Sequence, residues 1–148
     1  MKKFLSIFLV VFAISLVACN DKCDEGNQPT PGSFFVEIVD ETTNENVFEN
    51  GMYTSQQITI QDLDEATIPF EFIENLNLIQ IFPPVTNATG NTFVIKLNNE
   101  TTLQMDEIDV NYDVLSSAGE CFITFKIENI LFPYNTSELV ESIHVVKI

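Results

Sequence analysis

The stretch Ile108-Asp-Val-Asn-Tyr-Asp-Val-Leu115 alternates apolar and polar side chains almost without interruption. In an extended chain, the four apolar side chains at even positions, from Ile108 to Val114, would all lie on one face. The Asp and Asn side chains between them would lie on the opposite face, toward water. This period of two is typical of a β-strand that buries one side against a core, and not of an amphipathic helix.

The same alternation continues in both directions over most of the chain. Nine short segments are expected to be strands: 33–40, 56–62, 67–73, 76–82, 92–97, 101–105, 108–115, 120–130 and 143–148. Pro69 indicates that segment 67–73 lies at a sheet edge, because proline cannot donate a hydrogen bond to a neighbouring strand. Segment 76–82 is more continuously apolar, as expected of a strand covered on both faces. Residues 137–142 could form one helical turn, and a turn is expected at 116–119.

Eight or nine short strands joined by Asn-, Asp- and Gly-rich turns predict an all-β domain over residues 33–148. We expect an antiparallel β-sandwich of about 7–9 strands, immunoglobulin-like or transthyretin-like, and a closed barrel is the alternative. Asn77-Leu78 and Asn98-Asn99 have turn composition, since Asn tolerates positive φ. The chain has 13 Phe and no Trp, which favours an interior filled by side chains.

The opening of this domain carries a short resemblance. From Ser33 to Gly51 the chain runs from an expected strand through an Asp-x-Thr turn at Asp40 to an apolar pair. This order resembles the opening of transthyretin-like or carboxypeptidase-regulatory-like modules, which are seven-stranded sandwiches common in surface proteins. The family's usual Gly-Glu-Pro turn is missing, so the resemblance implies the fold class alone.

Residues 1–18 precede the domain and differ from it in character. Lys2 and Lys3 are followed by an apolar run, Phe4 to Ala18. As a helix this run would span about 22 Å, at ~1.5 Å per residue, which is short of the ~30 Å core of a bilayer. A positive beginning, a short apolar run and a small residue before the break describe a secretory signal peptide, which is removed.

Leu16-Val-Ala-Cys19 closes this signal and resembles the lipobox of bacterial lipoproteins. The resemblance implies that the Cys19 thiol receives a diacylglyceryl group, that the chain is cut just before it, and that the new amine is acylated. Several acyl chains would make a lasting membrane anchor, at ~0.8 kcal/mol per buried CH₂ group. A soluble secreted protein that is cut near this position is the alternative.

Residues 19–32 are polar, contain two prolines and are expected to form a flexible tether between anchor and domain. Lys22 followed by Asp24-Glu25 resembles the export signal of Bacteroidetes-type surface lipoproteins, although Cys23 interrupts it. Asn20 stands where the best-known inner-membrane retention signal has Asp. We therefore expect an outer-membrane lipoprotein that faces the periplasm or the cell surface. A solvated acidic tether is the plainer interpretation.

The chain carries 22 acidic residues against six lysines, has no arginine, and has a formal net charge of −16. Removal of residues 1–18 would take away Lys2 and Lys3 and bring the charge to −18. Such a charge argues against nucleic acid as a partner, because phosphates require clustered Lys or Arg. It also argues against peripheral binding to anionic lipid. It serves solubility at a crowded surface, or the attraction of a cationic partner.

Three cysteines are present, and acylation of Cys19 would leave Cys23 and Cys121. An even pair outside the cytoplasm predicts a disulfide, which would join the end of the tether to the sheet. The alternative is a buried Cys121 thiol with an exposed Cys23. The spacing of the cysteines and the single histidine do not match a zinc site.

No catalytic constellation stands out. His144 is the only imidazole, and its place among apolar residues of a terminal segment predicts an outward or rim position, not a catalytic base. No phosphate loop, HExxH or GxSxG motif occurs. We therefore expect a protein that is not an enzyme and needs no cofactor.

Two acidic clusters are weak candidates for calcium, which binds carboxylate and carbonyl oxygens. The first is Asp62, Asp64 and Glu65 in an expected loop, and the second is Asp106 with Asp109 at the entry of a strand. Neither matches the loop pattern of known calcium motifs. Solvated turns are the plainer interpretation.

The expected function is therefore that of a binding or accessory module for a protein or glycan partner. Loops carry function on such scaffolds, and the longest polar loop offers Phe82, Pro84, Asn87 and Asn91 as binding candidates. Tyr53 and Tyr134, like Phe82, could stack on a ligand, although burial is the simpler expectation for all three. A small-ligand carrier with a cavity inside a barrel, or a hydrolase, are the alternatives.

Overall fold

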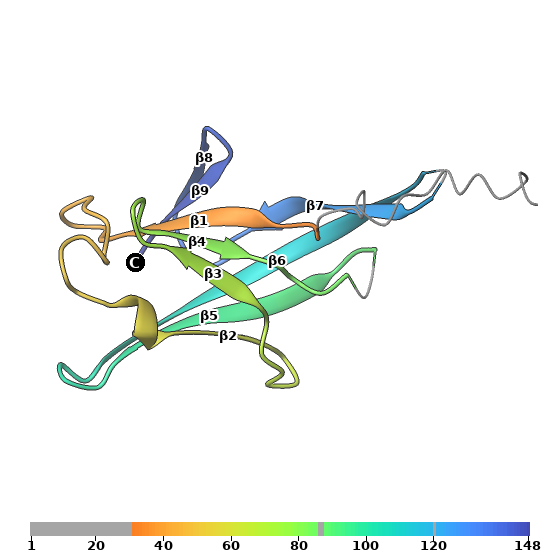
Figure 1. The fold of residues 1–148 in the computed structure, drawn as a ribbon. Coiled ribbons are helices and arrows are strands. Elements are labelled where there is room, and N and C mark those ends of the chain that lie inside the picture. The colour runs from red at the N-terminus through yellow and green to blue at the C-terminus, as the bar shows by residue number, and fades with distance from the viewer. Residues whose placement is uncertain (1–30, 86–87, 120) are drawn as a thin grey trace, which may run out of the picture.

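The computed structural model describes residues 31–85, 88–119 and 121–148. These residues form an all-β sandwich of two sheets that do not close into a barrel, as the alternation predicted (Figure 1). The predicted signal peptide 1–18, Cys19, Cys23 and nearly all of the predicted tether lie outside the described residues.

Nine strands and one 3-10 turn make up the regular structure of the described part. Their bounds are β1 (Phe34–Val39), η2 (Ser55–Gln57), β2 (Ile58–Asp62), β3 (Phe70–Ile73), β4 (Leu78–Ile81), β5 (Asn91–Asn99), β6 (Gln104–Ala118), β7 (Ile123–Leu131), β8 (Ser137–Val140) and β9 (Ile143–Lys147). One sheet has the strand order β3-β4-β1-β9-β8, and the other has the order β2-β5-β6-β7.

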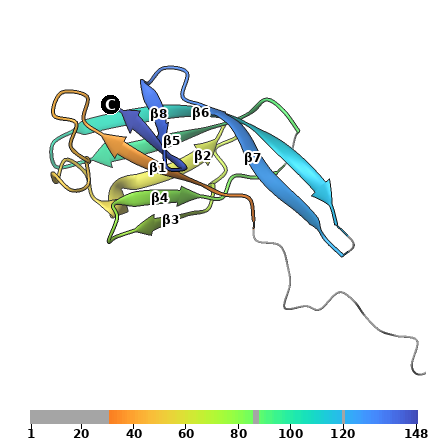
Figure 2. The same cartoon turned by 90° about the horizontal axis from the view of Figure 1, so that it is seen from above.

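Neighbouring strands are antiparallel with one exception, which corrects the predicted all-antiparallel arrangement. β1 and β9 are parallel, with Val36 beside His144 and Ile38 beside Val146. A parallel pair needs a long connection, and here the rest of the domain lies between the two strands. The first and last strands of the domain therefore lie side by side in the middle of one sheet (Figure 2).

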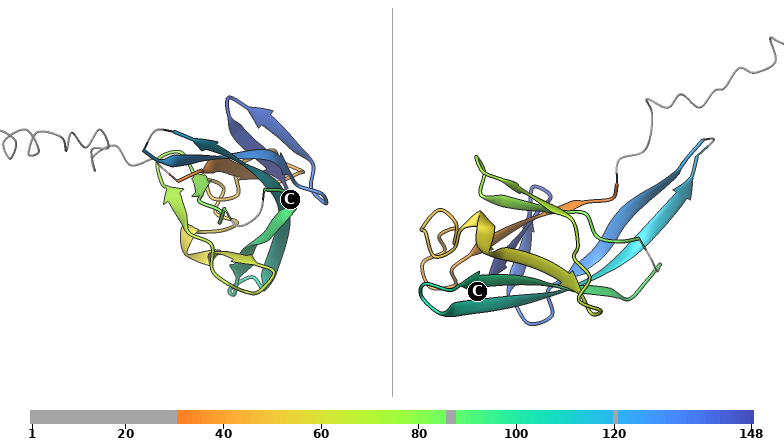
Figure 3. Two further views of the ribbon diagram at one scale, coloured as in Figure 1. Left: turned by 90° about the vertical axis from the view of Figure 1, so that its right-hand side faces the viewer. Right: turned by 60° about the horizontal axis from the view of Figure 1, so that its bottom comes forward.

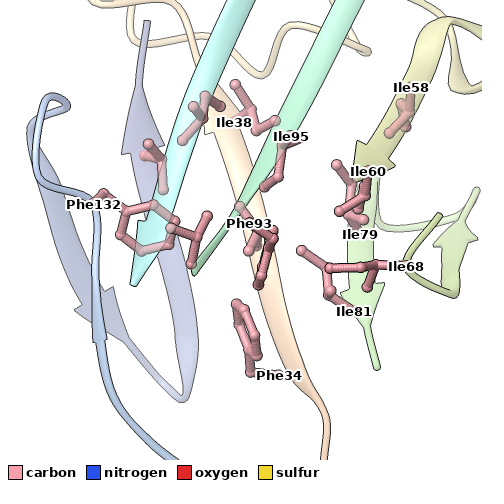
Figure 4. Close-up of a cluster of buried hydrophobic side chains, with 14 of the residues drawn as sticks. Phe34, Ile38, Ile58, Ile60, Ile68, Ile79, Ile81, Phe93, Ile95 and Phe132 are labelled. Atoms are coloured by element: carbon pink, nitrogen blue, oxygen red, sulfur yellow. The ribbon is translucent and has the colours of Figure 1, made fainter. Parts of the chain in front are cut away.

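The space between the sheets is filled by one continuous cluster of buried side chains (Figure 4). The four even positions of the opening stretch, from Ile108 to Val114, all belong to it, so this prediction is confirmed. Phe93 of β5 meets Phe34 of β1 across the interior, with ring centroids 6.2 Å apart. An interior packed in this way confirms the expectation of a filled core.

The prediction of separate strands at 101–105 and 108–115 is wrong, because a single long strand, β6, covers all of 108–115 and only the last two residues of 101–105. The turn before it is Glu100–Leu103, where Leu103 has a positive φ of 59°. Asn99 caps this turn, since its Oδ1 accepts hydrogen bonds from the Thr101 and Thr102 amides at 3.1 and 3.2 Å. The turn expected at Asn98-Asn99 thus follows these two residues, which end β5, and the positive φ is taken by Leu103.

Two further predictions need correction. Residues 137–142 form strand β8 and the tight turn to β9, and not a helical turn; Glu141 and Ser142 have positive φ values of 49° and 74°. The turn predicted at 116–119 begins later, because β6 continues to Ala118. β6 and β7 therefore extend beyond the opposite sheet as a long hairpin (Figure 2).

Two expectations about individual strands hold. β3, which follows Pro69 directly, is the terminal strand of its sheet, as Pro69 predicted. Asn77 has a positive φ of 53° in the turn between β3 and β4, as its composition indicated. The chain enters β1 past Gly32, where an added Cβ would lie 3.1 Å from the carbonyl oxygen of Phe125 and 3.2 Å from the Ile127 side chain. The entry of the chain is therefore packed against β7, at the base of the long hairpin.

Candidate partner-binding groove

The predicted binding loop between β4 and β5 is held to the sandwich where it leaves β4. The Tyr112 hydroxyl donates a hydrogen bond of 2.8 Å to the carbonyl oxygen of Pro84, and the Phe82 amide donates one of 3.0 Å to Pro69. Burial, and then the charge of Asp62, raises the pKa of Tyr112 to about 12, so the hydroxyl stays a donor.

Asn91 is the one binding-loop candidate that the structure places elsewhere. It is the first residue of β5 and only 6% of it is exposed, so it is not available to a ligand as predicted. Phe82 is half-buried, as the simpler expectation had it, and Asn87 lies outside the described residues. Of the candidates that the structure describes, Phe82 and Asn91 are thus less accessible than the sequence suggested.

The two acidic clusters considered for calcium have other partners in the fold. Asp62 Oδ1 accepts hydrogen bonds from the Asp64 and Ala66 amides, both at 2.9 Å, and so closes the turn after β2. Asp106 accepts hydrogen bonds from the Tyr53 hydroxyl and from Gln104. Asp106 and Asp109 are an odd number of positions apart on β6, so they point to opposite faces of the sheet. Among the described residues, no three His, Cys, Asp or Glu side chains gather to hold a metal ion.

The aromatic candidates divide between the core and the surface. Tyr53 is buried, as expected, and its hydroxyl bonds Asp106. Tyr134 is 84% exposed in the connection between β7 and β8, so the expectation that it is buried is wrong. The reason is that Phe132, two residues earlier, takes the inward position at this end of the core.

A groove of about 580 Å³ lies between the terminal strands of the two sheets. β7 ends one sheet and β8 ends the other, and both strands line the groove. Within the described residues no strand pairs with the outer edge of either, so each presents a row of backbone donors and acceptors. Figure 3 shows these two strands at the same side of the sandwich.

His144 lines the groove from its inner side. Its ring lies between two core aromatics, with centroids 5.8 Å from Phe34, edge-on, and 5.6 Å from Phe132. Burial lowers the pKa of His144, so the imidazole is neutral at neutral pH. The prediction gave His144 an outward or a rim position, and the structure has it at the rim of the core, pointing inward.

Leu139 faces the groove from β8. It lies directly opposite His144 across the β8–β9 pair, and opposed residues of antiparallel strands point to the same face of a sheet. Leu139 therefore points inward, toward the other sheet, yet it remains 65% exposed. An inward-pointing leucine that nothing covers is the most unusual packing feature of the groove.

A β-bulge shapes the opposite wall. On β6, only Tyr112 lies between Asn111 and Asp113. On β7, two residues, Asn129 and Ile130, lie between the partners of these two positions. Asn129 has a positive φ of 51° and donates a 2.8 Å hydrogen bond to Asp113. The bulge turns Ile130 inward as well as Ile127, so the wall of the groove is apolar at this point.

Asp113 holds the bulge to the neighbouring loop. One carboxylate oxygen accepts from Asn129, and the other accepts from the Gly90 amide at 3.0 Å. These hydrogen bonds, the one from Asn129 first, lower the pKa of the Asp113 carboxyl. On the β7 wall of the groove, Lys126 and Glu128 form a 2.8 Å ion pair.

The groove presents two inward-pointing polar side chains beside its apolar ones. Ser137 and His144 both line the groove and point inward on neighbouring strands, but Ser137 is opposed to Val146 and not to His144. The causes of the pKa shift of His144 include no carboxylate partner that could orient its ring as a base. Backbone edges, apolar side chains and one neutral imidazole can bind an extended chain by pairing and packing.

Cys121 lies in the connection between β6 and β7, at the tip of the long hairpin, and is disulfide-bonded. Cys23, its predicted partner, lies outside the described residues, so the pairing of these two cysteines stays a prediction. In the part of the chain that the structure covers, no helix has the length and apolar character needed to traverse a bilayer. Comparison with protein-family models, curated proteins and solved structures finds no significant match to the chain.

Proposed function

We propose that this chain is a non-catalytic, lipid-anchored protein that holds an extended segment of a protein partner in the groove between β7 and β8. The anchor follows from the lipobox at Cys19, and the tether of residues 19–32 places the sandwich away from the membrane. The protein would belong to the outer membrane, and would face the periplasm or the cell surface.

The observation that carries the binding role is the inward-pointing, uncovered Leu139. A strand inserted between β7 and β8 would cover Leu139 and would satisfy the backbone groups at the free edge of β8. Burial of an exposed leucine side chain contributes roughly 1.5–3 kcal/mol, a large share for a single contact. Alternate side chains of the inserted strand would lie on Ile127 and Ile130.

The bulge at Asn129 supports pairing with β8 in preference to β7. A bulge interrupts the regular spacing of donors and acceptors, which is one way in which proteins protect an edge from further pairing. β8 has no bulge over its four residues. The β7 wall would then supply side-chain contacts, and β8 would supply the hydrogen bonds.

A carrier function has less support than it had from the sequence. The two sheets do not form a barrel, and the space between them is filled by the core cluster. A hydrolase would need a base with an oriented partner, and burial alone accounts for the pKa of His144.

The proposal is tested by a photoreactive amino acid at position 139 of the full-length protein in its native cell. Leu63 is the matched control, because it is 78% exposed in the turn after β2, away from the groove. We expect position 139 to cross-link one protein through a short extended segment, and position 63 to yield no such product. Identical products from both positions, or none from position 139, would contradict the groove as the binding site.

A matched substitution separates binding from folding. For this test the photoreactive residue is placed at position 130. Leu139→Lys should reduce the yield of the cross-linked product. It should leave the melting temperature unchanged, because Leu139 is largely exposed. Leu63→Lys should change neither. If both variants retain the product, Leu139 does not hold the partner.

A further inference from the structure

The outer face of the five-stranded sheet carries several apolar side chains. Several strands of this sheet carry two apolar residues in succession, among them Phe34-Phe35 of β1 and Val145-Val146 of β9. In a strand, successive side chains point to opposite faces, so one member of each pair must point away from the core. Phe34 and Val146 belong to the core cluster, and Phe35 and Val145 do not.

The strand register brings four such outward side chains together. Phe35 of β1 lies beside Ile143 of β9, and Ile143 is opposed to Val140 of β8. Val145 is two positions along β9 from Ile143, on the same face. We refer to Phe35, Val140, Ile143 and Val145 as the outer patch. None of the four contacts the core cluster, and Val140 is 46% exposed.

The neighbouring part of the same face has apolar side chains that are covered. Val39 and Leu78 also point away from the core cluster, yet each is only 6% exposed. Asn46 lies next to them and donates hydrogen bonds to Glu37 at 3.3 Å and to the carbonyl oxygen of Asn77 at 3.0 Å. The chain thus covers one end of this face with its own connection after β1, and leaves the outer patch more open.

The charges beside the outer patch are mainly negative. Glu37 and Glu138 flank Val145 on either side, in the same row across the sheet. Lys147 also lies on this face, but its ammonium group donates to Asn44 Oδ1 at 2.8 Å and forms no ion pair with either glutamate. The chain as a whole has a net charge of −16, so a second copy or an acidic protein would be repelled.

We propose that the outer patch is a second docking surface, for a protein partner whose apolar contact side chains are flanked by lysine or arginine. Apolar centres with a charged rim are typical of protein interfaces, and rim charges select partners of opposite sign. This surface is on the opposite face of β8 and β9 from the groove, since Leu139 and His144 point inward and Val140 and Ile143 point outward. The inference goes beyond the proposed function, and the two surfaces could be occupied at the same time.

The test uses the purified full chain and a defined probe: an amphipathic helical peptide with a leucine stripe bordered by lysines. A second peptide has glutamates in place of the lysines. Amide chemical shifts are followed during titration with each peptide. We expect the lysine peptide to shift the resonances of β1, β8 and β9, and the glutamate peptide to shift none.

Val145→Asp distinguishes a specific surface from general attraction between a basic peptide and an acidic protein. It adds a negative charge, which would strengthen general attraction, but it disrupts the apolar centre of the patch. We expect binding to weaken by about tenfold or more, the loss typical of an interface hot spot. Thr59→Asp, an exposed position on β2 of the other sheet, adds the same charge and should not weaken binding. Glu37→Gln with Glu138→Gln should weaken binding a few-fold and reduce its dependence on salt.

Several results would overturn the proposal. The first is that the lysine peptide shifts only resonances of the groove. The second is that Val145→Asp and the wild type bind this peptide equally. The third is that the glutamate peptide binds at the outer patch. Self-association of the chain that Val145→Asp abolishes would assign the patch to a second copy, which also contradicts it. Leu139→Lys should leave the titration unchanged, so failure here is distinguishable from failure of the groove.

Discussion

The hydroxyl of Tyr53 donates a hydrogen bond to the carboxylate of Asp106, and this contact joins the long connection after β1 to the start of β6. Tyr53 is buried with the core cluster, and Asp106 also accepts a 3.2 Å hydrogen bond from Gln104. Burial first, and then the Asp106 carboxylate, raise the pKa of Tyr53, so the phenol remains a donor at any physiological pH. The pair therefore fixes the connection to the sandwich.

Tyr53→Phe should lower the free energy of unfolding by about 1–2 kcal/mol, because it removes one hydrogen bond to a charged group and keeps the ring in the core. Urea denaturation gives this quantity. Tyr134→Phe is the matched control, since Tyr134 is exposed, and it should change nothing. Equal stability of Tyr53→Phe and the wild type would mean that the contact does not hold the connection.

His144 should make stability depend on pH below about 7. Burial lowers its pKa in the folded state below the ordinary value of about 6.5, so below that pH the unfolded chain binds more protons than the folded one. The stabilisation that the neutral His144 ring contributes is therefore complete above about pH 6.5, and it declines as the pH falls toward the folded-state pKa. His144→Phe should flatten the melting temperature across this interval. A pH dependence of the same size in His144→Phe and in the wild type would refute the assignment to His144.

The bulge in β7 should depend on Asn129 for two reasons, its positive φ of 51° and its hydrogen bond to Asp113. Asn129→Ala should cost about 1–2 kcal/mol of unfolding free energy, since alanine is strained in the left-handed region. Asn129→Gly removes the strain and should cost less. In both variants the pKa of the Asp113 carboxyl, followed by NMR titration, should rise toward its ordinary value. Asn98→Ala, in a regular part of β5, should leave that pKa unchanged.

The disulfide of Cys121 should pair with Cys23. Unfolded, unreduced protein should then show no free thiol, provided that Cys19 is acylated, and Cys23→Ser should show one. In the chain-entropy model, closure of a loop of this length contributes about 4–5 kcal/mol, so Cys23→Ser and Cys121→Ser should lower the denaturation midpoint equally. Two free thiols in the wild type would contradict the pairing.

The period of two predicted most of the sandwich because it is a local property of the chain. The stretch Ile108 to Leu115 has its predicted faces, and Pro69 marks an edge strand as expected. β8 was missed because its turn carries no Gly or Asn: Glu141 and Ser142 take up positive φ values there. Turn signals in sequence depend on residues that tolerate this region easily, and these two do so only in the folded context.

The groove could not be predicted, because it depends on which strands end each sheet. That order is set by contacts between distant segments, above all by the parallel pairing of β1 with β9. The burial of Asn91 could not be predicted either. Its polar surroundings in the sequence indicated a loop, and gave no sign that β5 would begin at this residue and bury it. The sequence does contain a sign of the outer patch, which is the successive apolar residues of β1 and β9. Only the strand register, however, shows that these residues lie side by side.

The account depends most on the claim that this sandwich acts outside the cytoplasm at the end of a lipid anchor. Intact-mass and peptide mass spectrometry of the protein isolated from native membranes test it directly. The account predicts a mature chain that begins at Cys19 and carries a diacylglyceryl group with an acylated amine, and predicts that Cys19→Ser lacks this mass. A mature chain that begins at another residue and carries no acyl mass would contradict it.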